Sequence, residues 1–268
     1  MTRTTTENHR RHPLAVRRRI RRLAALAGAA AVAATATAGC GAIGDALGTS
    51  VDRYEAACAL LVDGSGSAGE APDGFDAEAK LASSLPDFLA DRECRTLAYA
   101  PITRASEGSL CQAEPLDLDP DADATLDRDE LRASQRAVAS GRALELLECA
   151  REHSPGSDVI GALDRVATAA PADGEAFSVL VVSDFVQRDS SFELPHEDLT
   201  TPESRAALLD DLAERGRLPE GLAGATVYPS GYGMRLSRDS DAYADFDAFW
   251  TELLEGRVGA DVDATYQR

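Results

Sequence analysis

Two apolar runs in this chain each lead into an aspartate, and this feature constrains the fold more than any other. The run Phe177–Val182 is rich in β-branched residues, as in a strand buried on both faces of a parallel sheet, and Ser183-Asp184 follows it. The run Ala56–Val62 leads into Asp63-Gly64-Ser65-Gly66-Ser67. Propensity alone would allow a helix there, but the abrupt glycine-rich break after it favours a buried strand.

Helical and strand patterns alternate along the rest of the chain. Apolar spacing predicts helices over residues 74–92, 131–153, 159–169 and 202–215, and further strands over 95–103, 110–118 and 225–228. A last helix carries the aromatic residues expected in the core, Tyr243, Phe246, Phe249 and Trp250. This alternation predicts an α/β, Rossmann-like doubly wound fold, with a mainly parallel central sheet of about six strands flanked by helices. Ligands bind such sheets beyond the carboxyl ends of the central strands, where Asp63 and Asp184 are expected.

The first 39 residues have the layout of a secretory signal. Five arginines between positions 17 and 22 precede an uncharged, alanine-rich stretch that ends in small residues. That stretch, residues 23–38, is shorter than the ~20 residues of a membrane span. Thr37-Ala38-Gly39-Cys40 resembles a bacterial lipobox, which implies lipidation of Cys40, although leucine is favoured where this chain has Thr37. Ordinary secretion with Cys40 as a spare thiol is the alternative.

These features predict a lipoprotein signal peptide over 1–39, a lipid-anchored tether over 40–50, and a location on the outer face of the cell membrane. Arg17-Arg18-Arg19-Ile20 also resembles a twin-arginine export signal, so the export route stays open. Stable anchoring needs more than one acyl chain, because a single chain binds only marginally. Residues 1–39 hold eight arginines and one glutamate, so their removal changes the formal net charge from −19 to −26. This acidity argues against nucleic acid and suits the attraction of divalent cations.

Four cysteines remain beyond the lipobox. Cys58, Cys94, Cys111 and Cys149 form an even set in an exported chain, which predicts two disulfides with three possible pairings. The expected strand order favours Cys94–Cys111, joining the second and third strands, and Cys58–Cys149, pinning the first strand to the long helix. Free buried thiols are the alternative. Zinc ligation is not expected, because no C-x-x-C spacing is present.

The motif Asp63-x-Ser65-x-Ser67 supplies oxygen atoms of the kind that a hard divalent cation binds. Three oxygen side chains at alternate positions of a tight turn can converge on one point, and Gly64 and Gly66 permit the turn. The motif resembles the D-x-S-x-S of the von Willebrand factor A (VWA) family. Gly156–Leu163 is similar to that family's G-T-D-x-x-x-A-L segment, with Ser157 in place of threonine, and Ser183-Asp184 is similar to the end of its fourth strand.

The resemblance spans roughly residues 51–255 and implies one VWA-like domain over 51–268 with a metal-ion-dependent adhesion site. The implied ligands are Asp63, Ser65, Ser67, Ser157 and Asp184. Ser65 and Ser67 would ligate directly through their hydroxyls. Ser157, Asp63 and Asp184 would ligate directly or through water, which leaves one position for a partner protein's carboxylate. Mg²⁺ is the expected cation, with Mn²⁺ or Ca²⁺ as alternatives. Phe185 departs from the family, which usually has glycine after this aspartate; the alternative is a family fold without a metal.

A second acidic loop, residues 119–130, fits an EF-hand-like calcium loop at most ligand positions. Its candidate ligands are Asp119, Asp121, Asp123, Thr125, Asp127 and Glu130. Ala124 stands where glycine makes the sharp turn, and no helix is expected before the loop. The alternative is an acidic loop whose last carboxylates favour a helix N-terminus.

The expected function is metal-dependent binding of a protein partner, without catalysis. A structural or scaffold lipoprotein that has the adhesion-type fold but no working metal site is the main rival. A third alternative is an envelope hydrolase. The sequence does not favour it, because it has no G-x-S-x-G nucleophile elbow and no Walker or G-x-G-x-x-G loop. The histidines beyond the signal segment, His153 and His196, are expected to be exposed.

Overall fold

A central sheet of six strands organises the domain. The computed structural model describes residues 53–70, 74–121, 126–153, 156–172, 175–236 and 238–267; the predicted signal segment, Cys40 and the tether lie outside them. The sheet has the order β3-β2-β1-β4-β5-β6. Its strands are β1 (Ala56–Asp63), β2 (Cys94–Ile102), β3 (Leu116–Asp117), β4 (Phe177–Val182), β5 (Thr226–Ser230) and β6 (Asp261–Val262). Only β3 pairs antiparallel, so the predicted mainly parallel sheet is confirmed.

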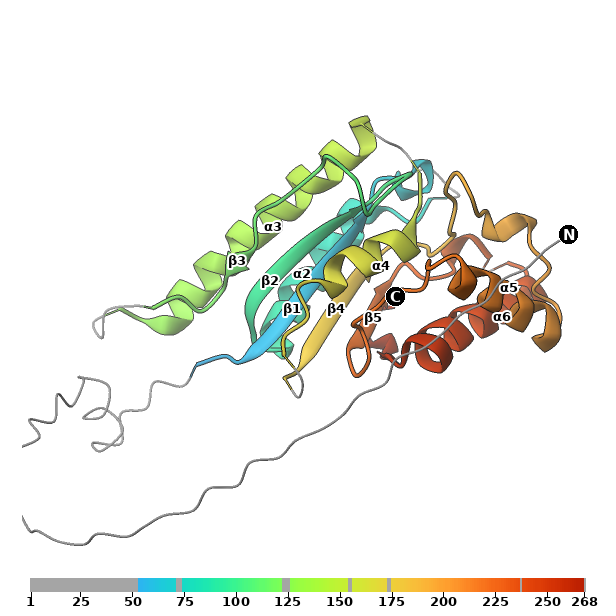
Figure 1. Cartoon of the computed structure of the whole chain (residues 1–268). Coiled ribbons are helices and arrows are strands. Elements are labelled where there is room, and N and C mark those ends of the chain that lie inside the picture. Colours follow the sequence, from blue (N-terminus) through green and yellow to red (C-terminus); the bar gives the residue numbers. More distant parts are fainter. Residues whose placement is uncertain are drawn as a thin grey trace, which may run out of the picture. The chain divides into compact units, whose positions relative to one another are not determined.

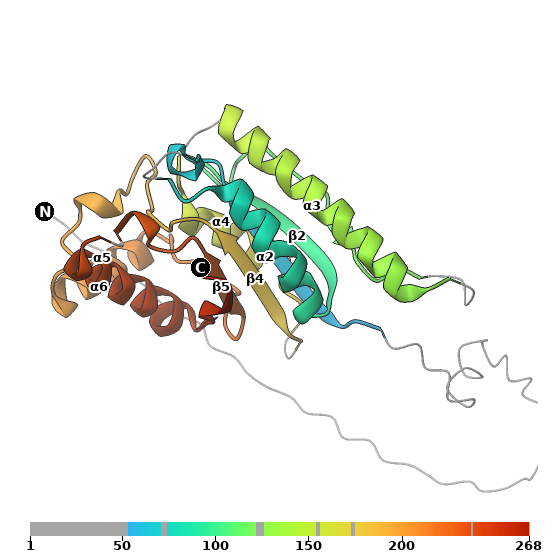
Figure 2. The same cartoon turned by 180° about the vertical axis from the view of Figure 1, so that it is seen from behind.

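Helices cover both faces of this sheet, as Figures 1 and 2 show from opposite sides. One face packs against α2 (Ala77–Asp91) and α3 (Arg128–His153). The other packs against α4 (Val159–Ala167), α5 (Pro202–Glu214), α6 (Ser240–Thr251) and the π-helix η4 (Glu252–Val258). Successive side chains of a strand point to opposite faces, so Leu60 packs with α2 and α3, whereas Leu61 packs with α4 to α6. The predicted doubly wound architecture follows from this division.

The winding reverses between β1 and β4. The chain passes from β1 to β2 on one side, and after α4 it adds β4, β5 and β6 on the other side. The register pairs Val62 with Val182 in parallel neighbours, so Asp63 and Ser183 leave the sheet next to one another. Ligand sites of open α/β sheets form at such a reversal, because the loops diverge there and leave a crevice.

The expected third strand, over residues 110–118, is wrong except at its end. Only Leu116–Asp117 pairs with β2, and residues 103–115 form a loop. Leu110, which a buried strand would enclose, is 91% exposed. The predicted helices are present with ends shifted by a few residues. α3 begins at Arg128 because Asp127 Oδ1 accepts from the N–H groups of Asp129 (2.9 Å) and Glu130 (3.3 Å).

Two disulfides are present, but both predicted pairings are wrong. Cys58 is bonded to Cys94, with Cα atoms 5.6 Å apart, and Cys111 is bonded to Cys149, at 5.8 Å. β1 and β2 are hydrogen-bonded neighbours, and their register brings Cys58 beside the start of β2. Cys111 lies in the loop between β2 and β3, and its partner Cys149 lies on α3. The expected bond to Cys94 needed a third strand at Cys111, and that strand is absent there.

Aromatic side chains fill the layer between α6 and the sheet. Phe246, Phe249 and Trp250 are buried and Tyr243 is partly buried, which confirms their predicted place in the core. Among the helices of the described segments, none combines the length and the apolar character needed to cross a bilayer.

Candidate metal centre

The turn after β1 gathers three of the predicted ligands. Asp63 is fully buried, and its Oδ1 accepts from the Ser65 N–H at 2.8 Å. A single 3₁₀ turn, η1 (Gly66–Ala68), then bends the chain back, so that the Ser65 and Ser67 hydroxyls lie 2.9 Å apart. The turn therefore collects one carboxylate and two hydroxyls within five residues of sequence.

The two glycines of this turn were expected to provide conformational freedom, but the structure does not use them in that way. Neither Gly64 nor Gly66 has a positive φ, so the turn does not need their conformational freedom. A Cβ atom on Gly64 would lie 2.5 Å from Cβ of Ala150 on α3, so only glycine lets the turn pack this closely on the helix. A Cβ on Gly66 would meet nothing within 4 Å.

Ser157 reaches the same carboxylate from the loop before α4. Its hydroxyl donates to Asp63 Oδ2 at 3.1 Å. The loop is fixed by paired backbone bonds, from the Ser157 N–H to the Arg188 carbonyl (3.1 Å) and from the Arg188 N–H to the Ser157 carbonyl (2.8 Å). Gly156 passes close to the loop after β2, since its Cβ would lie 2.4 Å from Cα of Arg104. The position of Ser157 is thus set by two neighbouring loops.

The segment after β4 completes the group. The Ser183 hydroxyl donates to Asp63 Oδ2 at 2.6 Å, a contact that the motif-based prediction missed. Asp184 is fully buried; its Oδ1 accepts from the Val186 N–H at 3.0 Å, while its Oδ2 has no hydrogen-bond partner among the described residues. A buried carboxylate oxygen without a partner is unusual and costly in a folded protein, and a bound cation would satisfy it.

Phe185 stands where the VWA family, which the sequence motif resembles, usually has glycine. The residue has φ of 60°, in the left-handed region that glycine adopts without strain. For other residues this conformation costs roughly 1–2 kcal/mol. The Phe185 ring is buried and contacts the rings of Tyr232 and Trp250 edge to face, with centroids 5.0 and 5.1 Å away. Aromatic packing therefore offsets the backbone strain.

Two buried carboxyl groups in one centre resist ionising together. Burial raises the pKa of Asp63 to about 7, and the charge of Asp184 adds to this shift, while hydrogen bonds from Ser183 and Ser65 oppose it. Burial also raises the pKa of Asp184, and the Val186 N–H and the nearby Ser67 hydroxyl oppose that shift. A divalent cation would stabilise both carboxylates, and the donors are the hard oxygens that Mg²⁺ prefers. The residues present therefore fit the predicted metal.

A cavity of about 430 Å³ opens over this centre. Its lining comes from loops at the carboxyl edge of the sheet: Ser65, Gly66, Ser67, Gly74, Arg104, Gly156, Ser157, Val186, Arg188 and Arg235. Three of the predicted ligands thus face a space that an outside group can enter.

A buried polar network holds the Ser157 loop from behind. Asp158 caps α4 by accepting from the Gly161 N–H at 3.0 Å, and it also accepts from the Ser106 N–H at 3.0 Å. Gln187 donates to Asp158 at 3.2 Å and to Asp189 at 2.9 Å, linking the loops before α4 and after β4. No motif in the sequence marks Gln187, since its partners are distant in the chain.

In the second acidic loop, the first candidate calcium ligand is already bonded to other residues of the protein. Asp119 is buried, and its Oδ1 accepts from Arg128 (2.5 Å) and Arg132 (3.0 Å), while its Oδ2 accepts from the Tyr54 N–H (3.0 Å). Burial alone would raise the pKa of Asp119, but the hydrogen bonds from Arg132 and Tyr54 and the two arginine charges lower it to about 2. Calcium at the first loop position would have to displace these bonds.

The other candidate calcium ligands do not converge in the described part of the loop. Asp121 is exposed and pairs with Arg53, Asp127 caps α3, and Glu130 is exposed. Asp123 and Thr125 lie outside the described residues. This arrangement matches the alternative reading, in which the last acidic side chains favour the start of α3.

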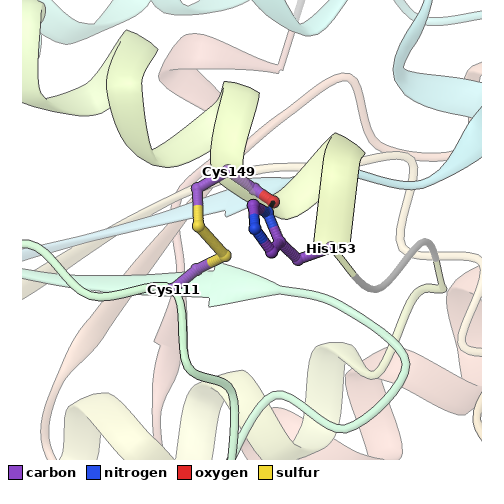
Figure 3. A group of neighbouring side chains, drawn as sticks. All are labelled: Cys111, Cys149 and His153. Carbon is purple, nitrogen blue, oxygen red and sulfur yellow. Dashed lines mark hydrogen bonds between the residues drawn. A yellow bond between two sulfur atoms is a disulfide. The ribbon is translucent and has the colours of Figure 1, made fainter.

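A second cluster of side chains that often ligate metals lies at the end of α3, but its two cysteines form a disulfide. Figure 3 shows Cys111, Cys149 and His153, whose candidate ligand atoms lie within 4.8 Å of one another. The two sulfurs are joined in a disulfide, so neither is a thiolate that could ligate. His153 Nδ1 lies 3.1 Å from the Cys149 carbonyl oxygen, one helical turn earlier, and the side chain is exposed, as expected. His196 is also exposed.

Comparisons with known proteins add little to this description. No protein-family model matches the chain, and no curated protein matches its sequence. Among solved structures, the crystal structure of the human COPII-coat protein Sec24c is similar, with 11% sequence identity and a TM-score of 0.34. The match covers 80% of this chain but only 30% of the Sec24c chain. The α/β fold of this chain therefore rests on its own sheet and helices.

Proposed function

We propose that this chain is a lipid-anchored, extracytoplasmic protein of VWA type that binds Mg²⁺ between Asp63 and Asp184 and, through the metal, a carboxylate of a protein partner. The unpartnered Oδ2 of Asp184 carries the proposal. Asp184 lies buried in the same centre as Asp63, and its negative charge raises the pKa of Asp63. A cation between them would coordinate the unpartnered oxygen and reduce the repulsion between the two carboxylates.

Each residue of the centre has a distinct part in this proposal. Ser65, Ser67 and Ser157 line the cavity, and their hydroxyls would supply neutral oxygen ligands. Asp63 and Asp184 supply the charge that balances a divalent cation. Ser183 holds Asp63 Oδ2 in place through its 2.6 Å hydrogen bond. The cavity leaves room for one outside ligand, and the partner's carboxylate would take that position.

Calorimetric titration of the full chain with Mg²⁺, in detergent, tests the proposal directly. The expected result is saturable binding that Asp63→Ala abolishes and that Asp87→Ala retains, since Asp87 is an exposed residue of α2. Circular dichroism would establish that both variants are folded. A folded wild-type protein that binds neither Mg²⁺ nor Mn²⁺ would contradict the proposal and favour a scaffold role.

The anchoring part of the proposal rests on the sequence around Cys40 alone. Metabolic labelling with a fatty acid is expected to mark the wild-type chain and not Cys40→Ser. The same substitution should move the protein from the detergent phase to the aqueous phase in a phase-partition assay. Unchanged partition of Cys40→Ser would contradict lipid anchoring.

A further inference from the structure

Three arginines surround the mouth of the candidate metal centre. Arg104 follows β2, Arg188 lies in the loop after β4, and Arg235 belongs to η3 (Met234–Leu236), so three separate segments bring them to one cavity. All three are exposed. Arg188 pairs with Glu193 at 3.5 Å in an exposed ion pair, and such pairs are weak and easily exchanged. The charges of Arg188 and Arg235 also act on Asp184, where both oppose the rise in its pKa. For Arg104 and Arg235, no ion pair occurs within the described ranges.

This local positive charge contrasts with the rest of the chain. The whole sequence carries a formal net charge of −19, yet among the described residues every charged side chain that lines this cavity is an arginine. With a divalent cation bound, its two charges would balance Asp63 and Asp184. One incoming carboxylate would then balance one arginine, and Glu193 pairs with Arg188, so one guanidinium group would remain unmatched. A complementary ligand therefore carries at least one further negative group beside the one at the metal.

The rest of the lining narrows the class of ligand. Among the described residues that line the cavity, Val186 is the only large apolar side chain, and none is aromatic. This part of the lining thus offers no ring on which a nucleic-acid base could stack. The acidic chain would also repel a long polyanion at a distance. Guanidinium groups instead pair with carboxylates in a bidentate, geometrically specific way.

We propose that Arg104, Arg188 and Arg235 select an acidic peptide segment of the partner, with carboxylates flanking the one that ligates the metal. This inference rests on the metal-dependent function proposed above and deepens it. The arginines would act as specificity-determining residues: they discriminate among segments that all carry the metal-binding carboxylate. The acidic remainder of the surface would keep such segments from binding elsewhere.

Fluorescence polarisation with end-blocked peptides of equal length tests this selection. The peptides carry one, two or three glutamates in an otherwise neutral sequence, and the full chain is used at saturating Mg²⁺. The expected result is roughly tenfold tighter binding of the three-glutamate peptide than of the one-glutamate peptide. Arg104→Gln, Arg188→Gln and Arg235→Gln combined should remove this preference. Arg95→Gln is the matched control, since Arg95 is exposed at the opposite end of β2.

Mg²⁺ calorimetry on the same variants separates the two proposals. Intact Mg²⁺ binding together with equal affinity for all three peptides, or for none, would overturn the arginine selection alone. A glutamate preference that depends on the arginines but persists without any Mg²⁺ binding would overturn the metal centre and leave the acidic-peptide selection standing. Displacement of the peptide by inorganic phosphate at lower concentration than by free peptide would overturn the peptide assignment in favour of a phosphate ligand.

Discussion

The Ser157 hydroxyl donates a 3.1 Å hydrogen bond to Asp63 Oδ2, although 94 positions separate the two residues in the chain. This bond ties the loop before α4 to the end of β1. Metal coordination would use the same oxygen atoms, so hydrogen bonds and a cation compete for one set of lone pairs.

Replacing Asp184 with asparagine should have opposite effects on stability and on metal binding. The amide removes the negative charge that raises the pKa of Asp63, so the protein without added metal should melt several degrees higher at pH 8. The variant should also lose the stabilisation that Mg²⁺ gives the wild type. Differential scanning calorimetry with Mg²⁺ or with chelator measures both effects, and Asp87→Asn serves as the control. Equal Mg²⁺ stabilisation of variant and wild type would contradict the assignment of Asp184.

Mg²⁺ affinity should rise with pH as Asp63 ionises. The pKa of Asp63 is raised from 3.8 to about 7 in the folded chain, so below pH 7 a proton must leave before the cation binds. In chelator, the same shift makes the folded state less stable as pH rises from about 4 to about 7, because the unfolded chain ionises more readily. Titration calorimetry in two buffers of different ionisation enthalpy should detect proton release at pH 6. Mg²⁺ affinity that stays constant from pH 5.5 to 8 would be inconsistent with this shift.

The glycines of the D-x-S-x-S turn should differ in their tolerance of alanine. Gly64→Ala places a Cβ 2.5 Å from Ala150, so the turn or α3 must move; a loss of about 1–3 kcal/mol is expected, together with weaker Mg²⁺ binding. Gly66→Ala is the matched control, because its Cβ meets nothing within 4 Å. Urea denaturation compares the two variants. If both are equally stable, the close approach to α3 is not what requires Gly64.

Two substitutions of Phe185 separate backbone strain from side-chain packing. Both Phe185→Ala and Phe185→Gly lose the buried ring, at a cost of about 3–5 kcal/mol for alanine. Glycine relieves the strain at φ of 60°, so Phe185→Gly should be more stable than Phe185→Ala by about 1 kcal/mol. Denaturant unfolding of the two variants measures the difference. An alanine variant at least as stable as the glycine variant would show that this backbone is not strained.

The disulfides should be recovered as Cys58–Cys94 and Cys111–Cys149 in non-reducing peptide mapping. They close loops of 36 and 38 residues, for which the chain-entropy model gives about 4 kcal/mol each. Replacing both cysteines of one pair with serine should therefore lower stability markedly without altering the other bond. A peptide that links Cys94 to Cys111 would contradict the observed register.

Local patterns in the sequence determined the type of most elements and the position of the candidate centre. β-branched content and the glycine-rich break identified β4 and β1, and both candidate ligand aspartates lie where those strands end. Such patterns are reliable because they depend on side-chain spacing within a single element. The motif also defined which five oxygen-bearing residues should meet. The parallel pairing of β1 with β4 brings the ends of these strands together, and the loop before α4 adds Ser157.

Only the tertiary structure decided the disulfide pairing and several contacts between residues that are distant in the sequence. Cys58 pairs with Cys94 because β1 and β2 are adjacent in register, and no sequence spacing encodes that register. The hydrogen bond from Ser183 to Asp63 was not predicted, and the three arginines of the cavity belong to no motif. Strand order and loop packing bring them together, since these contacts join segments whose separation along the chain exceeds the range of any local periodicity.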